Sequence, residues 1–408
     1  MFPSLIDNKV LSFAKLRGGW SKTGQVSLSN WYGTLPSYST AAGFPYGSNA
    51  GFSLSTTLSN PLLKPETTKE VEIGMELSFL KNKMHLEANV YQSKTFDQTI
   101  PASLSASSGY YSALINAGEM DNKGLELDLK LTPLVNFGQV TWNASVAYSY
   151  MTSEVISILP GTLNELGVSD GTNTSASYAI VGQQFPAIKV TDVIRDPNGN
   201  IVVDKVTGLP SAATALVNAG HGNPNHILGI SSDLNYKGFR LSATAEYRGG
   251  NVIVNAVGNA LDFTGVSEHS AMNGRQSFII PGSVIETSPG VYTPNTTALV
   301  ANTGRAFWVN SAYHTTNRGY TTSAAFWKLR EVALTYDVPV KKLFGGNAIQ
   351  AAQIALLGRN LLMLRPKANI YTDPEFNNSA TTSNAVGYTT EDQTPPTRVY
   401  GFSVKLTF

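Results

Sequence analysis

The carboxyl-terminal segment 399–408 restricts the fold more than any other stretch of the chain. Its side chains alternate strictly, because small or polar residues separate the large apolar ones Tyr400, Phe402, Val404, Leu406 and Phe408. Successive side chains of a strand point to opposite faces, so one face of this segment is apolar and the other polar. Transmembrane β-barrels are built from strands of about ten residues with this pattern. The segment therefore predicts a barrel strand, provided that the rest of the chain repeats the pattern.

The same alternation recurs along the chain and is clearest in a hairpin, where segments 71–79 and 84–91 flank a turn at Lys81-Asn82. Three glutamates, at positions 70, 72 and 76, lie on one face of residues 70–79. They would be costly beside a dry core but suit a water-filled lumen. We predict ten strands, at 9–24, 71–79, 84–91, 125–132, 140–150, 228–236, 239–248, 326–338, 348–362 and 399–408.

The connections between these strands alternate in length. Short ones are predicted at 81–83, 133–138, 237–238 and 339–347, and long ones at 25–66, 100–113, 152–225, 249–325 and 363–396. Outer-membrane barrels have short periplasmic turns and long external loops, whereas a soluble β-sandwich has no reason to sort its loops. The predicted fold is therefore an all-β, antiparallel transmembrane barrel with both chain ends on the periplasmic side. Within the long loops we predict a helix at 251–263 and a small hairpin at 190–204.

The composition excludes several alternatives. Charged residues make up only 14% of the chain, and the net charge of +1 argues against a nucleic-acid partner. Cysteine is absent, which excludes disulfides and thiolate metal sites. No run of about 18 apolar residues predicts a transmembrane helix. Residues 1–7 lack the features of a signal peptide, so we expect either a mature chain or part of a longer one.

A series of short motifs links the chain to a known family. Residues 60–68 read Asn-Pro-Leu-Leu-Lys-Pro-Glu-Thr-Thr, and Glu-Ile-Gly follows at 72–74. This stretch is similar to the N-P-x-L-K-P-E-x-T…E-x-G motif of SusC/RagA-like TonB-dependent transporters. Further matches follow in the same order, at 108–110, 116–119, 122–126, 222–224, 326–334, 358–361, 373–375 and 396–402. Together they make nearly the whole chain resemble the carboxyl-terminal portion of that family.

The resemblance implies a larger protein than this sequence. It implies a barrel of about 22 strands in the outer membrane of a Gram-negative bacterium, in contact with lipid and lipopolysaccharide. It also implies TonB-driven import of oligosaccharides or peptides with a SusD-like surface lipoprotein. The sequence carries no plug domain, TonB box or earlier strands. We therefore expect 1–408 to be the carboxyl-terminal part of the receptor barrel, completed by a chain or segment that carries the plug and the remaining strands.

The sequence offers no catalytic constellation and no cofactor motif, so no enzyme activity is predicted. His221 and His226 have a spacing that suits metal ligands on a helix, but they lie in a loop. The segment from Asp196 to Asn200 loosely resembles a calcium loop. A plain Asn-Gly hairpin turn is the favoured interpretation, because the glycine sits at the wrong position and no glutamate closes the loop.

Three groups of residues are candidates for functional contacts. A lumen wall that faces the plug is predicted from Glu72, Glu76, Glu126, Asp128, Arg240 and Arg248, with a merely hydrated, salt-bridged wall as the favoured alternative. Contacts to substrate or lid are predicted for the loop aromatics Trp31, Tyr110, Tyr111, Trp308, Tyr313 and Tyr320. Packing of loops together or against a lid is favoured over stacking on substrate. By resemblance to outer-membrane proteins, the terminal strand would be a barrel-assembly signal through Tyr400, Phe402 and Phe408.

Two functions of different kinds fit these features. The first is active import of a sizeable nutrient through a gated barrel. The second is a non-transporting barrel that serves as a structural or docking component of an outer-membrane assembly. A free-standing ten-stranded barrel enzyme or adhesin is the weakest alternative.

Overall fold

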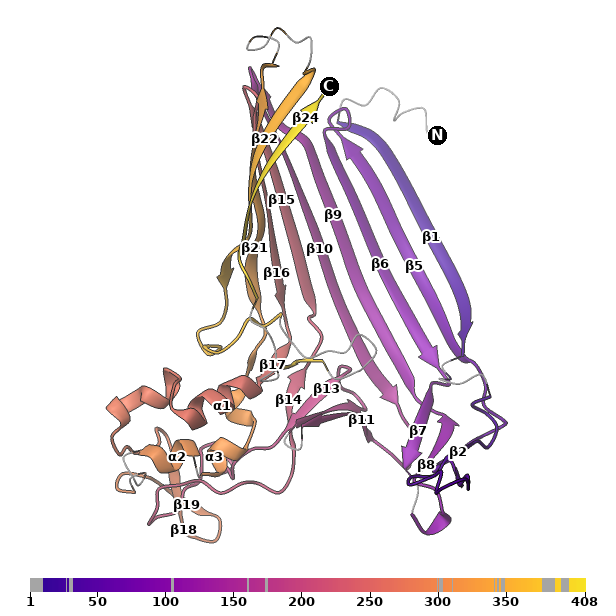
Figure 1. The fold of residues 1–408 in the computed structure, drawn as a ribbon, viewed down its shortest axis with the longest axis vertical. Coiled ribbons are helices and arrows are strands. Elements are labelled where there is room, and N and C mark those ends of the chain that lie inside the picture. The colour runs from indigo at the N-terminus through magenta and orange to yellow at the C-terminus, as the bar shows by residue number, and fades with distance from the viewer. Residues whose placement is uncertain are drawn as a thin grey trace.

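The computed structural model describes residues 10–26, 28, 32–103, 106–159, 161–172, 175–298, 300, 304–309, 311–340, 342, 345, 349–375, 386–389 and 396–408. Its main feature is one antiparallel sheet of ten strands that follow one another in chain order (Figure 1). These strands are β1 (Leu11–Gln25), β5 (Glu66–Phe79), β6 (Met84–Phe96), β9 (Glu119–Phe137), β10 (Val140–Ser157), β15 (His226–Tyr236), β16 (Phe239–Gly249), β21 (Phe326–Val338), β22 (Ala351–Leu364) and β24 (Val399–Thr407). The predicted number and type of strands are confirmed.

The strand register produces one continuous apolar face. Leu129 lies between Leu86 and Val146 on the neighbouring strands, and similar contacts continue to the last strand, where Leu356 lies beside Phe402. Side chains on this face are exposed rather than packed in a core, including Val71 (50%), Ile73 (60%) and Phe402 (67%). A contiguous apolar surface of this kind needs a covering partner, and along a wall of antiparallel strands that partner is lipid.

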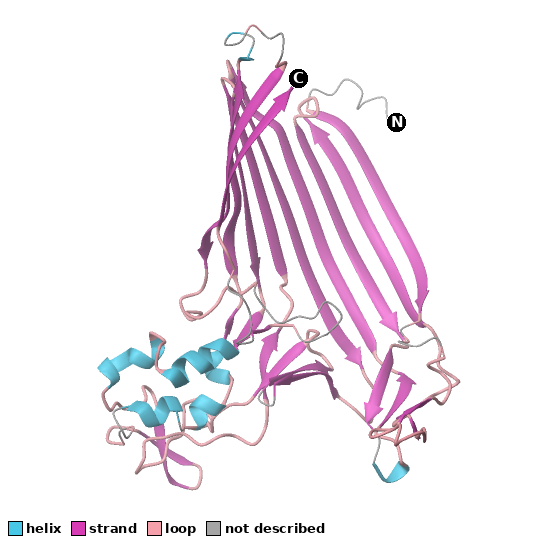
Figure 2. Cartoon of the chain, viewed as in Figure 1, coloured by secondary structure: helices cyan, strands magenta, loops and turns pink. Residues whose placement is uncertain are grey.

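The long loops lie at one end of the sheet, its outer end, and the short turns, the start of β1 and the end of β24 lie at the other (Figure 1). The loops fold into small sheets of their own, formed by β2 (Tyr38–Thr40) with β3 (Phe52–Leu54), by β4 (Thr57–Leu58), β8 (Ser112–Asn116) and β7 (Thr99–Ser103), by β11 (Glu165–Thr172), β12 (Ser175–Ile180), β13 (Ala187–Val190) and β14 (Val217–His221), by β20 (Thr321–Ser323), β17 (Val252–Asn255) and β23 (Tyr388–Thr389), and by β18 (Val284–Ser288) with β19 (Val291–Pro294). The helices α1 (Ala256–Thr264), α2 (Arg305–Val309) and α3 (Ala312–Thr315) also belong to these loops (Figure 2). No helix in the described part of the chain is long and apolar enough to cross a membrane.

Two local predictions need correction. The helix predicted at 251–263 starts only at Ala256, because the β-branched residues 252–254 form β17, whose Ile253 and Val254 are buried. The connection predicted at 133–138 is mostly strand, since β9 continues to Phe137. The small hairpin is present around Arg195 and Ile201, which form a β-bridge.

The polar face of the sheet, opposite the apolar one, is its inner face. A glycine of the Glu-Ile-Gly motif shapes this face. Gly74 on β5 lies in register between Arg17 on β1 and Asn89 on β6. A Cβ at this position would lie 2.3 Å from Asn89 Oδ1 and 2.6 Å from Arg17 Nε. The missing side chain lets Arg17 cross β5 and donate to Glu87 and Asn89 on β6, both at 2.6 Å. The glycine therefore allows an ion pair that ties the edge strand β1 to β6.

We expect Gly74→Leu to destabilise the full-length barrel by about 1–3 kcal/mol, because the new side chain must displace Arg17 or Asn89. Urea unfolding of the protein in detergent measures this change. Gly18→Leu is the matched control, since a Cβ at Gly18 meets nothing closer than 3.9 Å on the opposite face. Equal effects of the two substitutions would contradict the role given to Gly74.

The sheet is open in the part of the chain that the structure describes. There β1 and β24 each have a main-sheet neighbour on one side only. The expected pairing of these two strands with further strands of the complete barrel therefore stays a prediction.

Candidate functional site

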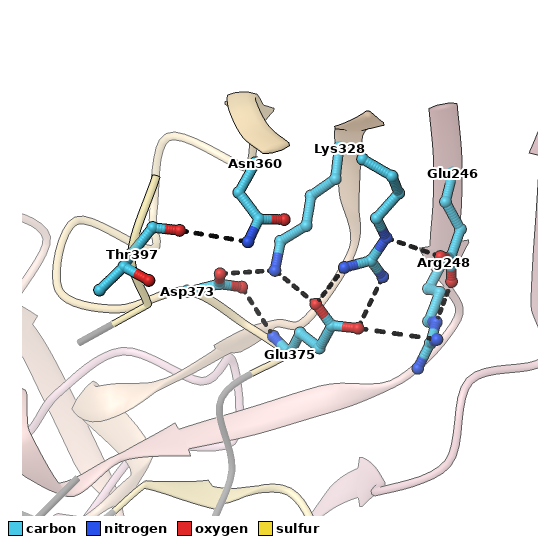
Figure 3. Close-up of polar contacts among 8 residues, drawn as sticks. Glu246, Arg248, Lys328, Asn360, Asp373, Glu375 and Thr397 are labelled. Atoms are coloured by element: carbon cyan, nitrogen blue, oxygen red, sulfur yellow. Dashed lines mark hydrogen bonds and ion pairs between the residues drawn. The ribbon is translucent and has the colours of Figure 1, made fainter. Parts of the chain in front are cut away.

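Two motif segments that lie about 45 residues apart meet on the inner face at the outer end of the sheet (Figure 3). Lys328 and Arg330 belong to β21 and both reach the inner face, since Lys328 lies in register with Glu246 on β16 and Arg330 donates to the same Glu246. Asp373 and Glu375 belong to the loop that follows β22. This loop therefore folds inward, along the lumen side of the wall.

The contacts form a dense ionic cluster. Lys328 Nζ lies 2.5 Å from both an Asp373 and a Glu375 oxygen. Arg330 donates to both oxygens of Glu375 at 2.6 Å and to Glu246 on β16 at 2.7 Å. Lys328 is 5% and Asp373 6% exposed, so these charges are buried. Arg248, one of the predicted wall residues, completes the cluster at 3.6 Å from Glu375 and in contact with Glu246.

The electrostatics of Glu375 predict a pH range for the cluster. Burial alone would raise the pKa of the Glu375 carboxyl, but hydrogen bonds from Arg330 and Lys328 outweigh burial and lower this pKa to about 2. A carboxyl with a lowered pKa in the folded state contributes its stability fully above its ordinary pKa. That contribution is lost as the pH falls from about 4.5 through about 2.

We therefore expect residues 365–375 to stay attached to the barrel wall at pH 5, and to detach only as the pH falls towards 2. Limited proteolysis with pepsin, which works across this range, measures the attachment when cleavage in 365–375 is compared with cleavage of the unfolded protein at each pH. Cleavage in 365–375 that is as fast at pH 4.5 as at pH 2, relative to the unfolded protein, would contradict the assignment.

A bulge positions the neighbouring motif. The pairing of β21 with β22 shifts between Leu329 and Glu331, opposite the Gly-Arg-Asn-Leu motif at 358–361. Asn360 adopts a positive φ of 53°, which asparagine tolerates better than most residues. Its side chain donates to the Thr397 carbonyl at 3.2 Å, so the Pro-x-Arg motif before β24 joins the same place.

A second pair of motifs meets at the outer ends of β5 and β9. The Asn116 side chain accepts from the Lys64 backbone N–H at 2.6 Å and donates to the Lys64 carbonyl at 2.8 Å. Glu66 accepts from the Thr99 backbone N–H at 2.9 Å. The Asn-Pro-x-Leu-Lys-Pro-Glu and Asn-Ala-Gly-Glu motifs thus fix one loop base to the other.

The predicted wall residues share the inner face but make two separate groups. Acidic residues follow one another in register across three strands, as Glu76, Glu87 and Asp128. The last two of them line a hollow of about 470 Å³ with Glu126. Lys15 lies 3.4 Å from Glu76, and Arg17 lies 3.8 Å from Glu72. Farther along the sheet, Arg240 on β16 pairs with Asp233 on β15 at 2.5 Å. These ion pairs fit a hydrated wall, and contact with a plug stays a prediction.

The candidate loop aromatics lie in different surroundings. Tyr111 is 64% exposed and Tyr110 is half-buried. Trp308 and Tyr320 are buried and flank Tyr313, with ring centroids 6.0 Å from it in both cases. Those three rings pack the loops together, while contact with a substrate or lid stays a prediction for the group. Trp31 lies outside the described residues.

The remaining candidates also have clear positions. Tyr400, Phe402 and Phe408 are all more than 65% exposed on or beside the edge strand β24, and their assembly role stays a prediction. His221 bonds to the Asn223 carbonyl and His226 to Tyr148, so the two histidines do not share a site. No group of three potential metal ligands occurs in the described ranges.

The ionic cluster was missed as a site by sequence reasoning. Its residues stand inside motifs at 326–334 and 373–375, but the motifs alone do not say that they touch. The available signal was charge: two cations at alternate positions of one strand and two acids at alternate positions of a distant loop.

Comparisons with known proteins agree on the family. The family model described as TonB dependent receptor-like, beta-barrel matches residues 7–361. TonB-dependent receptor P3 of Formosa agariphila is 24% identical over 396 residues, which are 91% of this chain and 37% of the relative. TonB-dependent receptor SusC of Bacteroides thetaiotaomicron is 26% identical over 254 residues, or 58% of this chain and 25% of the relative.

Among solved structures, the RagAB peptide importer in its open-open state superposes with a TM-score of 0.71 and 21% identity, over 100% of this chain and 41% of that chain. The chain thus spans well under half the length of these relatives, two of which are TonB-dependent receptors and one a peptide importer. The chain belongs to the TonB-dependent receptor-like β-barrel family, whose members lie in the outer membrane of Gram-negative bacteria.

Proposed function

We propose that the chain is the carboxyl-terminal part of a TonB-dependent active importer of oligosaccharides or peptides. The observation that carries the proposal is the two-faced wall: an apolar, exposed outer face and an ion-paired polar inner face across ten strands of a receptor barrel. A structural neighbour that is a peptide importer supports the peptide class, while the oligosaccharide class rests on the resemblance to SusC-like transporters.

The complete importer would need the strands that this chain lacks. Unpaired backbone groups in hydrocarbon cost several kcal/mol each, so we propose that β1 and β24 pair with the strands of the remaining protein. The same remaining part would carry the plug, with the acidic wall around Glu76 and Glu126 and the arginines Arg240 and Arg248 facing it. A polar interface of this kind can be made and broken reversibly during transport.

The proposed mechanism involves no bond chemistry. Cargo is captured at the outer loops under a SusD-like lipoprotein, with loops 152–225 and 249–325 as the proposed surface for this lid. TonB then pulls on the plug, and the cargo diffuses along the hydrated inner wall. The polar, ion-paired character of that wall suits passage, because it offers no large apolar surface on which cargo would stick.

Uptake by the full-length protein tests this proposal. Cells that carry it are given a fluorescent oligosaccharide series in one arm and a peptide series in the other, with and without deletion of the TonB box. We expect uptake in one arm, lost on the deletion. Unchanged uptake after the deletion would reject energised import, and absence of uptake in both arms would favour a structural role for the barrel.

A further inference from the structure

We propose that residues 365–375 form a rigid strut that couples the inner face of β21 to helix α1. The long outer loops that pack with α1 would then move together with the barrel wall as one rigid body. This inference concerns the construction of the outer end and does not rest on the proposed cargo.

The first anchor of the strut is the ionic cluster. Asp373 and Glu375 hold Lys328, and Glu375 also holds Arg330, with every one of these contacts at 2.5–2.6 Å. Since Lys328 and Asp373 are almost completely buried, neither can exchange its partner for water without leaving a buried charge unpaired. This end of the strut is therefore fixed to the wall.

The second anchor is a buried carboxylate of α1. The Tyr371 hydroxyl donates to Asp262 Oδ2 at 3.1 Å, and Asp262 is completely buried. The Tyr371 ring lies against Gly258, where a Cβ would come within 2.7 Å of a ring carbon. One residue further on, the Thr372 hydroxyl donates to Asn255 Oδ1 at 2.7 Å. Together the three contacts reach the last turn of α1, its first turn and the residue before the helix.

The residues that lead into the two adjacent anchors are braced internally. Arg365 donates to the Thr372 carbonyl at 2.6 Å and to the Ile370 carbonyl at 3.2 Å. The Asn369 side chain, only 1% exposed, accepts from the Thr372 backbone N–H at 3.2 Å. A linker that could bend freely would leave these backbone groups to water, so the bonds make the segment stiff.

The element held by the strut is part of a larger body. Next to α1, β17 pairs in parallel with β23. From β23, the Tyr388 hydroxyl lies 3.3 Å from the Ser177 hydroxyl in loop 152–225. The Arg318 backbone N–H donates to the Thr191 carbonyl at 3.0 Å, which joins loops 249–325 and 152–225 again. Fixing α1 therefore fixes the described parts of three long loops.

Hydrogen–deuterium exchange of the full-length protein in detergent tests the strut. The release variant is Asp373→Asn combined with Glu375→Gln, and Tyr371→Phe removes only the hydroxyl of the second anchor. Glu331→Gln is the matched control, because it removes one carboxylate from β21 that pairs with the exposed Arg359. Retention of heat-modifiable migration confirms that each variant forms a barrel.

We expect the release variant to raise exchange in α1 by at least about tenfold, since the helix loses its link to the wall. Tyr371→Phe should raise exchange in α1 by a smaller factor, and Glu331→Gln should leave it unchanged. Faster exchange confined to 365–375, with α1 at its wild-type rate, would overturn the proposal. If the release variant forms no barrel, Tyr371→Phe decides: wild-type exchange in α1 of that variant would equally overturn the coupling.

Discussion

Replacing Lys328 with methionine is expected to destabilise the outer end of β21 by about 3–5 kcal/mol, because it leaves the buried Asp373 carboxylate without its cation. Asp373 is 6% exposed, and the 2.5 Å contact from Lys328 is its ion pair in the described structure. Arg330 would still hold Glu375 but not Asp373. Native-state hydrogen exchange of residues 326–331 in the full-length protein measures the local free energy of opening.

Arg359→Met provides the comparison for this substitution. Arg359 on β22 pairs with Glu331 on β21 at 2.9 Å, but these side chains are 56% and 40% exposed. An exposed pair contributes no more than about 1 kcal/mol. A Lys328→Met effect no larger than that of Arg359→Met would show that the cluster is solvated and does not hold the loop.

The second large effect is expected on the outer face. Leu129→Arg places a charge in the middle of the apolar register, between Leu86 and Val146, where arginine on lipid costs about 2–4 kcal/mol. Urea titration of the full-length protein folded into lipid vesicles measures the loss. The reason is physical: the guanidinium must be carried into hydrocarbon or must pull the bilayer surface towards it.

Ser149→Arg is the matched control for this charge. Ser149 lies on the inner face in register with Glu126, so the new arginine meets water and an opposite charge. We expect a change of less than about 0.5 kcal/mol, as for most substitutions at solvated positions. Equal losses for the two substitutions would mean that both faces of the sheet see the same environment.

Most of the sheet could be predicted from the sequence because lipid imposes a simple rule. Wherever one face meets hydrocarbon, every second residue must be apolar. Residues 125–131 show this pattern, because leucines alternate with charged residues along them. The rule fails where the strands leave the membrane. At 19 residues, β9 is roughly 60 Å long, well beyond an apolar band about 25 Å tall, so its ends carry no alternation and the predicted segment was too short.

The outer loops could not be predicted in the same way, because their contacts depend on partners far away in the chain. The buried residues of β17, such as Val254, are buried by Tyr388 and Ile188 from two other loops. The ionic cluster shows the same limit. The sequence displays Lys328 and Glu375, but only the inward course of the loop after β22 brings them together. Charge alternation in a motif is thus a hint of pairing, not an assignment of partners.

Site-directed spin labelling of residues 125–131, one at a time in the full-length protein in lipid vesicles, tests the two-faced wall most directly. Collision rates with oxygen report lipid, and those with a water-soluble nickel chelate report the aqueous lumen. We predict a period of two: oxygen accessibility at 125, 127, 129 and 131, and nickel accessibility at 126, 128 and 130. Protection of the odd positions from both reagents would place these leucines in a packed protein core and contradict the barrel wall.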